Sequence, residues 1–304
     1  MTEAQKSTIS LIICTRNRAQ AVVRSLDAVA TAALNAPELA IELIVVDNGS
    51  TDGTPQVLAD WAAAATLKTR VVVEPRPGLS CARNAALKVA RHEILAMTDD
   101  DCEMRPDYFS MLAAAHSARG APAIIGGRVD LGDPRDLPIT IKTESEKMTY
   151  RLGKKPGGFV MGANLTFHQE VLRAVGAFDE RFGAGAPFVA AEDTDYILRA
   201  SLLGIPVEYD PSFAVNHFHG RRALSEAKAL LKGYSYGDGA LYAKHLFGSL
   251  IPLKLLKAAA ANAVKETLGR TPRHPIMGRE YAFKLIHNLR GLAAYAMGSR
   301  VRRP

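Results

Sequence analysis

The 304-residue sequence has few cysteines, a single tryptophan and no long uninterrupted hydrophobic run. Its three cysteines, Cys14, Cys81 and Cys102, form no CxxC pair, which argues against a disulfide framework or a thiolate zinc site. No stretch reaches the ~18 to 20 apolar residues that a membrane-spanning helix needs. Residues 1–6 show no signal-peptide pattern. We therefore expect a cytoplasmic protein with reduced, buried thiols.

The first predicted strand, residues 8–14, is not followed by a glycine-rich phosphate loop. The absence of a GxGxxG pattern at this place excludes an NAD-type dehydrogenase. A nucleotidyltransferase also binds a metal through aspartates on a Rossmann-like sheet, but it would need a basic, glycine-rich loop here. Residues 14–18, CTRNR, contain arginines and no glycine, which counts against that alternative.

The net charge of +7 is spread unevenly along the chain. Residues 221–304 carry 16 Lys/Arg against 4 Asp/Glu, whereas residues 1–220 have an excess of acidic side chains. Such a basic region favours an anionic partner. We expect peripheral contact with the inner face of the cell membrane, the alternative being packing on the rest of the chain or on a second subunit. Nucleic acid is not expected, because no aromatic–basic platform is present.

Short β-rich runs alternate with alanine-rich helical stretches over the first hundred residues. This order predicts a parallel sheet with right-handed crossovers, and ligands bind beyond the carboxyl ends of such strands. Residues 15–17, 47–48 and 99–101 follow three of these strands. The polar side chains therefore gather at one edge of the sheet, which is where we expect the active site.

The second half of the chain predicts a different pattern, with a long loop at 132–158 and only helices after residue 222. Further strands are expected at 123–131, 159–168, 206–210 and 212–216, and helices at 106–119 and 192–203. We thus predict an α/β fold, Rossmann-like and mostly parallel, with a C-terminal helical appendage. Residues 1–220 would form the catalytic domain, with a nucleotide-binding half at about 1–105 and an acceptor half at about 106–220, and residues 221–304 the basic helical region.

Three consecutive aspartates, Asp99, Asp100 and Asp101, end the fourth predicted strand. Like charges at this spacing repel one another unless a cation is present. Mg²⁺ and Mn²⁺ take oxygen ligands and usually share them with substrate phosphates. The run therefore indicates a divalent metal site, with a solvated acidic turn that caps the next helix as the alternative.

Five segments follow one another along the chain, namely CTRNR at 14–18, VVDNGSTDGT at 45–54, GLS with ARN at 78–84, DDD at 99–101, and the acidic pair ED at 192–193. In this order they resemble the family 2 glycosyltransferases, an inverting family with the GT-A nucleotide-sugar fold. The resemblance spans roughly residues 8–220, and no single motif is decisive, but five in the correct order form a specific signal.

The resemblance implies a role for individual residues. Asp193 matches the general base that takes the proton of the acceptor hydroxyl. The remaining residues fall into nucleotide binding (Thr15, Arg16, Asn17, Asp47, Arg83, Asp99, Asp100), metal binding (Asp101, His217) and the acceptor side (Gly162, Asn164, Glu192).

Several of these residues also have a purely structural alternative. Asp47 could cap the turn that follows it, and Arg83 could form an ion pair with one of the aspartates. In an extended segment His217 and His219 point to the same side, which leaves either as the metal ligand. Asp195 lies on a different helical face from Asp193, and we expect a structural role for it.

The implied activity is inverting transfer of one sugar from a nucleotide-diphosphate donor to the hydroxyl of a glycan or a lipid-linked acceptor, as in cell-envelope or exopolysaccharide biosynthesis. Processive synthases of the family carry a Gln-x-x-Arg-Trp motif and membrane spans, but the single tryptophan here is Trp61, in an early helix. A non-catalytic nucleotide-sugar-binding protein is a further alternative, against which the intact Asp101 and Asp193 argue.

Overall fold

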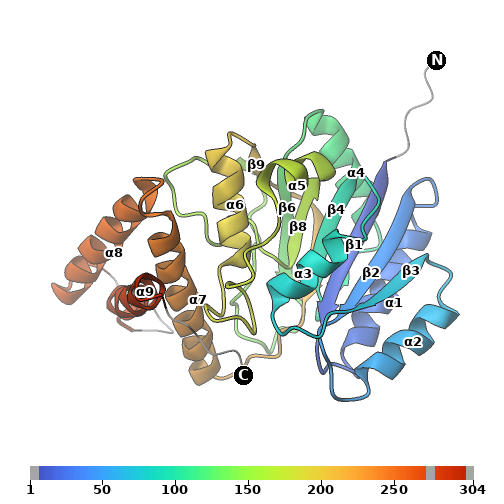
Figure 1. The fold of residues 1–304 in the computed structure, drawn as a ribbon, viewed down its shortest axis with the longest axis horizontal. Coiled ribbons are helices and arrows are strands. Elements are labelled where there is room, and N and C mark those ends of the chain that lie inside the picture. The colour runs from blue at the N-terminus through green and yellow to red at the C-terminus, as the bar shows by residue number, and fades with distance from the viewer. Residues whose placement is uncertain (1–6, 272–277, 299–304) are drawn as a thin grey trace.

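The computed structural model describes residues 7–271 and 278–298, in which a nine-stranded mixed sheet lies between two layers of helices (Figure 1). The elements in chain order are β1 (Thr8–Thr15), α1 (Val22–Leu34), β2 (Ala40–Asp47), α2 (Thr54–Ala64), β3 (Thr69–Val73), α3 (Leu79–Leu87), β4 (Ile94–Asp99), β5 (Cys102–Met104), α4 (Tyr108–Arg119), β6 (Ile124–Leu131), β7 (Met148–Thr149), β8 (Asn164–His168), α5 (Gln169–Val175), α6 (Glu192–Leu202), β9 (Val207–His217), α7 (Leu224–His245), α8 (Ile251–Thr267) and α9 (Glu280–Ala296).

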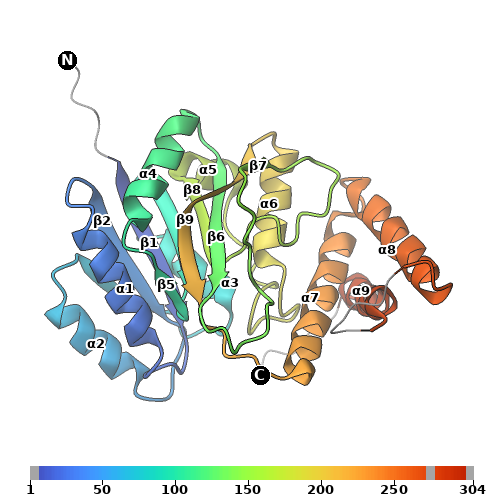
Figure 2. The ribbon, with the colours of Figure 1, turned by 180° about the vertical axis from the view of Figure 1, so that it is seen from behind.

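The first four long strands run parallel in the order β3-β2-β1-β4, as the βαβ pattern predicts. The central strand β1 is apolar along most of its length because both of its faces are buried. Two neighbouring residues illustrate this, since Leu11 packs toward α1 and α4, whereas Ile12 packs toward α3 and α6. Helices α1, α2 and α4 thus cover one face and α3, α5 and α6 the other, as Figures 1 and 2 show from opposite sides.

Beyond β4 the sheet becomes mixed, in the order β4-β8-β6-β9-β5. Strand β8 begins at Asn164 rather than at residue 159, because the backbone N–H of Asn164 closes a turn onto Met161. The two strands expected at 206–210 and 212–216 are one strand, β9, which passes through Pro211 where its pairing with β6 shifts register. The short β5, which was not predicted, pairs with the end of β9 and sets Cys102 opposite His217.

Between residues 221 and 298, as far as the structure describes them, the C-terminal region forms the helices α7, α8 and α9. Helix α7 crosses α9 at very short range, since a Cβ on Gly239 or Gly291 would overlap the backbone of the facing helix. The same helix covers Phe182 and Phe188 of the irregular segment before α6. Among the residues that the structure describes, no helix is both long and apolar enough to cross a membrane. The domain boundary at residue 220 stays a prediction.

Candidate active site

Polar side chains line a cavity of about 340 Å³ at the carboxyl edge of the parallel strands. The register places Cys14 of β1 beside Asp99 of β4, so the loops that follow these two strands meet. Six of the predicted residues line this cavity, namely Thr15, Arg16, Asp99, Asp100, Asp101 and His217. The clustering expected from the βαβ pattern is therefore present.

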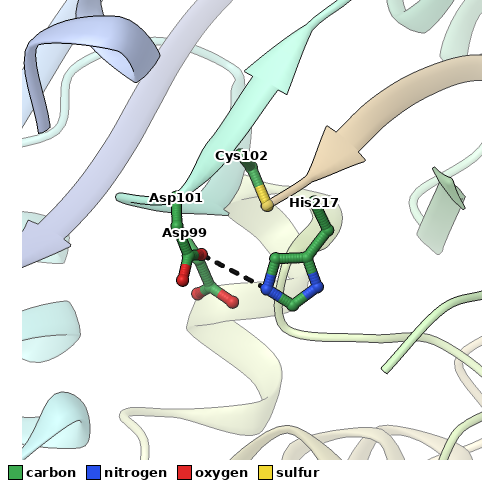
Figure 3. A group of neighbouring side chains, drawn as sticks. All are labelled: Asp99, Asp101, Cys102 and His217. Carbon is green, nitrogen blue, oxygen red and sulfur yellow. Dashed lines mark ion pairs between the residues drawn. The ribbon is translucent and has the colours of Figure 1, made fainter. Parts of the chain in front are cut away.

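A metal-ligand group of four neighbouring side chains is formed by Asp99, Asp101, Cys102 and His217 (Figure 3). It lies at one side of this cavity. The pairing of β5 with β9 brings His217 to the aspartate run, with its Nε2 at 3.2 Å from Oδ1 of Asp101. The other ring nitrogen, Nδ1, lies 3.1 Å from the carbonyl oxygen of Thr140. A carbonyl can only accept, so Nδ1 carries the proton and Nε2 faces Asp101, the orientation of a metal-binding histidine with a backbone partner.

The pKa shifts of this group describe a charged pair of His217 and Asp101, and it is the donor atoms of the group that suit a hard divalent cation. Burial opposes the charged form of His217, but the hydrogen bond and charge of Asp101 outweigh it, and the pKa of His217 is raised. Burial likewise opposes ionisation of Asp101, yet its bond to His217 and nearby arginines hold its pKa low. Burial raises the pKa of Cys102 well above its usual value, so this residue stays a thiol. The available donors are thus carboxylate oxygen and imidazole nitrogen, which suit Mn²⁺ or Mg²⁺.

Two arginines that the motifs did not single out also line the cavity, Arg18 and Arg221. Arg18 lies 2.9 Å from Asp101 and 3.6 Å from Asp100. Asp100 in turn accepts a hydrogen bond of 2.6 Å from the Thr15 hydroxyl. Burial raises the pKa of Asp100 to about 6, although Thr15 and Arg18 act in the opposite direction. The cavity therefore holds cations that can face a diphosphate next to carboxylates that can face a metal.

Arg83 of α3 connects the aspartate run to the acidic start of α6. Its side chain is almost fully buried and lies 2.9 Å from Glu192, 3.7 Å from Asp99 and 3.3 Å from the carbonyl oxygen of Gly162. A Cβ on Gly162 would lie 2.7 Å from the Arg83 guanidinium, so this position has no room for a side chain. The ion-pair alternative for Arg83 is present in the structure.

Helix α6 begins with Glu192 and Asp193 after a strained backbone, since Ala191 has a φ of +70°. Such strain in a residue other than glycine is typical of functional sites. The carboxylate of Asp193 accepts hydrogen bonds from the backbone N–H groups of Gly162 (3.0 Å) and Thr194 (2.6 Å). Burial and the charge of Asp193 raise the pKa of Glu192 to about 7, against the effect of Arg83. Both acidic residues line a second cavity of about 370 Å³.

Asn17, Asp47 and Asn164 line neither cavity and instead make contacts that hold the surrounding backbone. Asp47 accepts from the backbone of Ser50, which is the turn-capping alternative. Asn17 accepts from the backbone of the same turn at Thr51. Asn164 is completely buried, and its amide bonds the Tyr108 hydroxyl and a β6 carbonyl. The contacts of Asn17 and Asn164 are long-range, which is why local patterns did not reveal them.

His219 and Asp195 hold structural positions. His219 bonds the Leu137 carbonyl through Nε2 and accepts from the Arg221 backbone, which leaves His217 as the histidine of the metal-ligand group. Asp195 is fully buried and lies 2.7 Å from Lys244 of α7 and 2.8 Å from His245. The interpretation of Asp195 as structural fits these contacts.

The fold, together with the acidic residues at the carboxyl edge of its parallel strands, defines a class of enzymes. The family described as Glycosyl transferase family 2 matches residues 10–176, more than half of the chain. The chain therefore belongs to glycosyl transferase family 2, and it is a glycosyltransferase with a GT-A fold and an added C-terminal helical region.

Individual relatives are consistent with this membership. Glycosyltransferase AglE of Haloferax volcanii is 25% identical over 232 residues, which are 76% of this chain and 72% of AglE. The succinoglycan biosynthesis protein ExoO of Rhizobium meliloti is 30% identical over 114 residues, 37% of this chain and 31% of ExoO. The mannosyltransferase PcManGT of Pyrobaculum calidifontis, solved with GDP-Man and Mn²⁺, has a TM-score of 0.63 at 20% identity over 98% of this chain and 89% of its own.

Proposed function

We propose that the protein transfers a single sugar, with inversion, from a nucleotide-diphosphate donor in the first cavity to an acceptor hydroxyl in the second. The observation that carries this proposal is the contact between the two cavities. Leu79 and Ala184 line both of them, and Arg83 touches Asp99 on one side and Glu192 on the other. A donor and an acceptor would therefore meet beside Asp193.

In the first cavity we assign the nucleotide and its diphosphate to Thr15, Arg16, Asp99 and Asp100. A divalent cation held by Asp101 and His217 would supply Lewis-acid stabilisation of the charge on the leaving diphosphate. Asn17 and Asp47 support this site by holding the turn at residues 50–51. The Mn²⁺ and GDP-Man in the PcManGT complex and the UDP-GlcNAc in a complex of S. aureus TarS support a donor of this class.

Asp193 is the proposed general base. Its carboxylate is held by the backbone N–H groups of Gly162 and Thr194, so it keeps one orientation while it accepts the proton of the attacking hydroxyl. Attack from this side, opposite the leaving diphosphate, inverts the configuration of the anomeric carbon. The contact with Asp193 also gives Gly162 its place on the acceptor side.

The basic C-terminal region suits peripheral contact with an anionic membrane surface. Helix α8 and the residue after it expose Leu253, Val264 and Leu268, and the lysines Lys254 and Lys257 are exposed beside them. Apolar side chains flanked by lysines are typical of helices that lie in a membrane interface. A lipid-linked acceptor would be reached from that position, and one relative is named as a glucosyl-dolichyl phosphate glucuronosyltransferase.

The proposal is tested by incubating the purified protein with UDP-, GDP- and dTDP-linked sugars in the presence of Mn²⁺, Mg²⁺ or EDTA. Slow transfer to water releases nucleoside diphosphate, so the acceptor need not be known. We expect release from one donor, its loss in EDTA, and its loss in Asp101→Ala. Folded protein that neither releases a diphosphate nor binds any nucleotide by calorimetry would refute the proposed reaction.

A further inference from the structure

The second cavity is lined by several parts of the chain that are distant in sequence. Besides Leu79 and Ala184, its walls are the start of α6 with Asp193 and the residues just before it, the loop at residues 155–161, and the helices α7 and α9. Gly157 is a point of close approach between them, because a Cβ there would lie 3.5 Å from Thr194 of α6 and 3.6 Å from Asp238 of α7. The C-terminal helices therefore complete a cavity whose opposite wall carries the proposed base.

One face of α7 is turned toward this cavity. Leu231, Tyr234, Ser235 and Asp238 all line it, and their spacing of three and four residues places them on one side of a helix. Gly237 permits this orientation, since a Cβ there would lie 2.9 Å from the carbonyl oxygens at positions 188 and 190. The close approach of α7 to that segment positions Tyr234 and Asp238 opposite α6.

Hydrogen-bond donors and hydrogen-bond acceptors lie side by side in the cavity. Oδ2 of Asp238 lies 3.1 Å from Nζ of Lys155, and Lys155 is half-exposed while Asp238 is nearly buried. A carboxylate only accepts hydrogen bonds and an ammonium group only donates them. A hydroxyl group does both, so this pair can bind adjacent hydroxyls of a sugar ring. Tyr234 is 43% exposed and offers an aromatic face with a polar tip beside the pair.

The charge and size of the cavity restrict its occupant. Its acidic residues are Glu192, Asp193 and Asp238, and its basic residues are Lys155 and Lys284. Each lysine lies against a carboxylate, Lys155 on Asp238 and Lys284 on Glu280. A strongly anionic group is therefore not favoured. The volume of about 370 Å³ is at the lower end of the roughly 300–1,000 Å³ of small-molecule sites, which suits one sugar residue.

We infer that this cavity binds the terminal sugar of the acceptor, with Asp238 and Lys155 holding its hydroxyls and Tyr234 lying against its ring. The inference rests on the proposed function and adds an acceptor class and its binding residues. Tyr234 and Asp238 lie on α7, outside the family segment matched at residues 10–176, so part of the acceptor choice would come from a helix that the family motifs do not describe.

The test uses the full-length protein, the donor identified by diphosphate release, and p-nitrophenyl glycosides as probe acceptors, with decyl phosphate as a non-sugar probe. The glycosides carry glucose, galactose, mannose, N-acetylglucosamine or glucuronic acid. We expect transfer to at least one glycoside. In Asp238→Asn and Tyr234→Ala the KM for that glycoside should rise about tenfold or more, because a hydrogen bond to a charged group or a ring contact is lost. Diphosphate release without acceptor is measured for each variant as well, so that a loss of donor turnover is distinguished from a loss of acceptor binding.

Lys232→Ala is the matched control, because Lys232 is an exposed residue of α7 that does not line the cavity. This variant should change neither the KM for the glycoside nor the rate of diphosphate release. Wild-type KM values for the glycoside in Asp238→Asn and Tyr234→Ala would overturn the inference. So would transfer to decyl phosphate alone, or no transfer to any probe by protein that turns over its donor. Folded protein that neither releases diphosphate nor binds any nucleotide fails earlier, and in that case the proposed function itself is refuted.

Discussion

Replacing Asp195 by alanine should lower the free energy of unfolding by about 3 kcal/mol. The carboxylate is fully buried and lies 2.7 Å from Lys244, 2.8 Å from His245 and 2.8 Å from Arg199. Removing one partner from a buried ion pair costs about 3–5 kcal/mol, because the remaining charge stays desolvated. The substitution also breaks the ion pairs that join α6 to α7 through this carboxylate, so we expect the C-terminal helices to loosen first.

The lower end of that range applies because the cations keep other partners. Lys244 remains 2.8 Å from Asp179, and Arg199 still donates to the carbonyl oxygens of Val175 and Ala177. Urea denaturation of the wild type and Asp195→Ala, with equal slopes, gives the difference directly. Asp193→Ala is the matched control: Asp193 is only half-buried, and its loss should abolish transfer with a much smaller effect on stability.

Asp195 should also make the free energy of unfolding depend on pH. Burial opposes ionisation of Asp195, but its bonds to His245, Lys244 and Arg199 outweigh this effect and lower its pKa from 3.8. A depressed carboxyl pKa contributes stability above the unfolded value and loses it as the pH falls through the folded value. Asp195→Asn should therefore lose less stability than the wild type on acidification below about pH 4. A change in unfolding free energy of under about 1 kcal/mol in Asp195→Ala at pH 7 would refute the stabilising role of the buried ion pairs of Asp195.

Two further predictions concern the C-terminal helices. Gly239→Ala should destabilise the protein by about 1–3 kcal/mol, because its Cβ would overlap the backbone of Asn288. The control is Gly233→Ala in the same helix, where a Cβ has room; it should stabilise the protein by up to about 1 kcal/mol. Urea denaturation compares the two variants. Lys257→Glu should reduce cosedimentation with phosphatidylglycerol vesicles and leave donor turnover unchanged; equal sedimentation of variant and wild type would contradict the membrane contact.

The first half of the fold could be predicted because its signals are local. Continuous apolar runs, each followed by a turn and a helix, identify β1 to β4 and their shared carboxyl edge. The antiparallel insertion of β8 between β4 and β6 could not be predicted, since it depends on pairing between residues about 70 apart, such as Leu95 with Phe167. The three-residue β5 is likewise too short to give a periodic signal.

The same distinction applies to the site. Alternation along β9 left His217 and His219 equivalent, and only the pairing of β5 with β9 brings His217 to Asp101. Arg18 lies inside a motif but acts through a contact 83 residues away, which no spacing rule reveals. The face of α7 that carries Tyr234 and Asp238 has a visible helical spacing, but the sequence does not say what that face meets.

The proposed reaction depends most on a divalent cation held by Asp101 and His217. Mn²⁺ binding, followed by the electron paramagnetic resonance of free Mn²⁺ in the presence of the donor's nucleoside diphosphate, tests this directly. We predict that Asp101→Ala and His217→Ala each weaken binding by at least about tenfold. Cys102→Ser, at a buried thiol beside the site, should bind Mn²⁺ as the wild type does. Equal Mn²⁺ affinity in the wild type and Asp101→Ala would contradict the account.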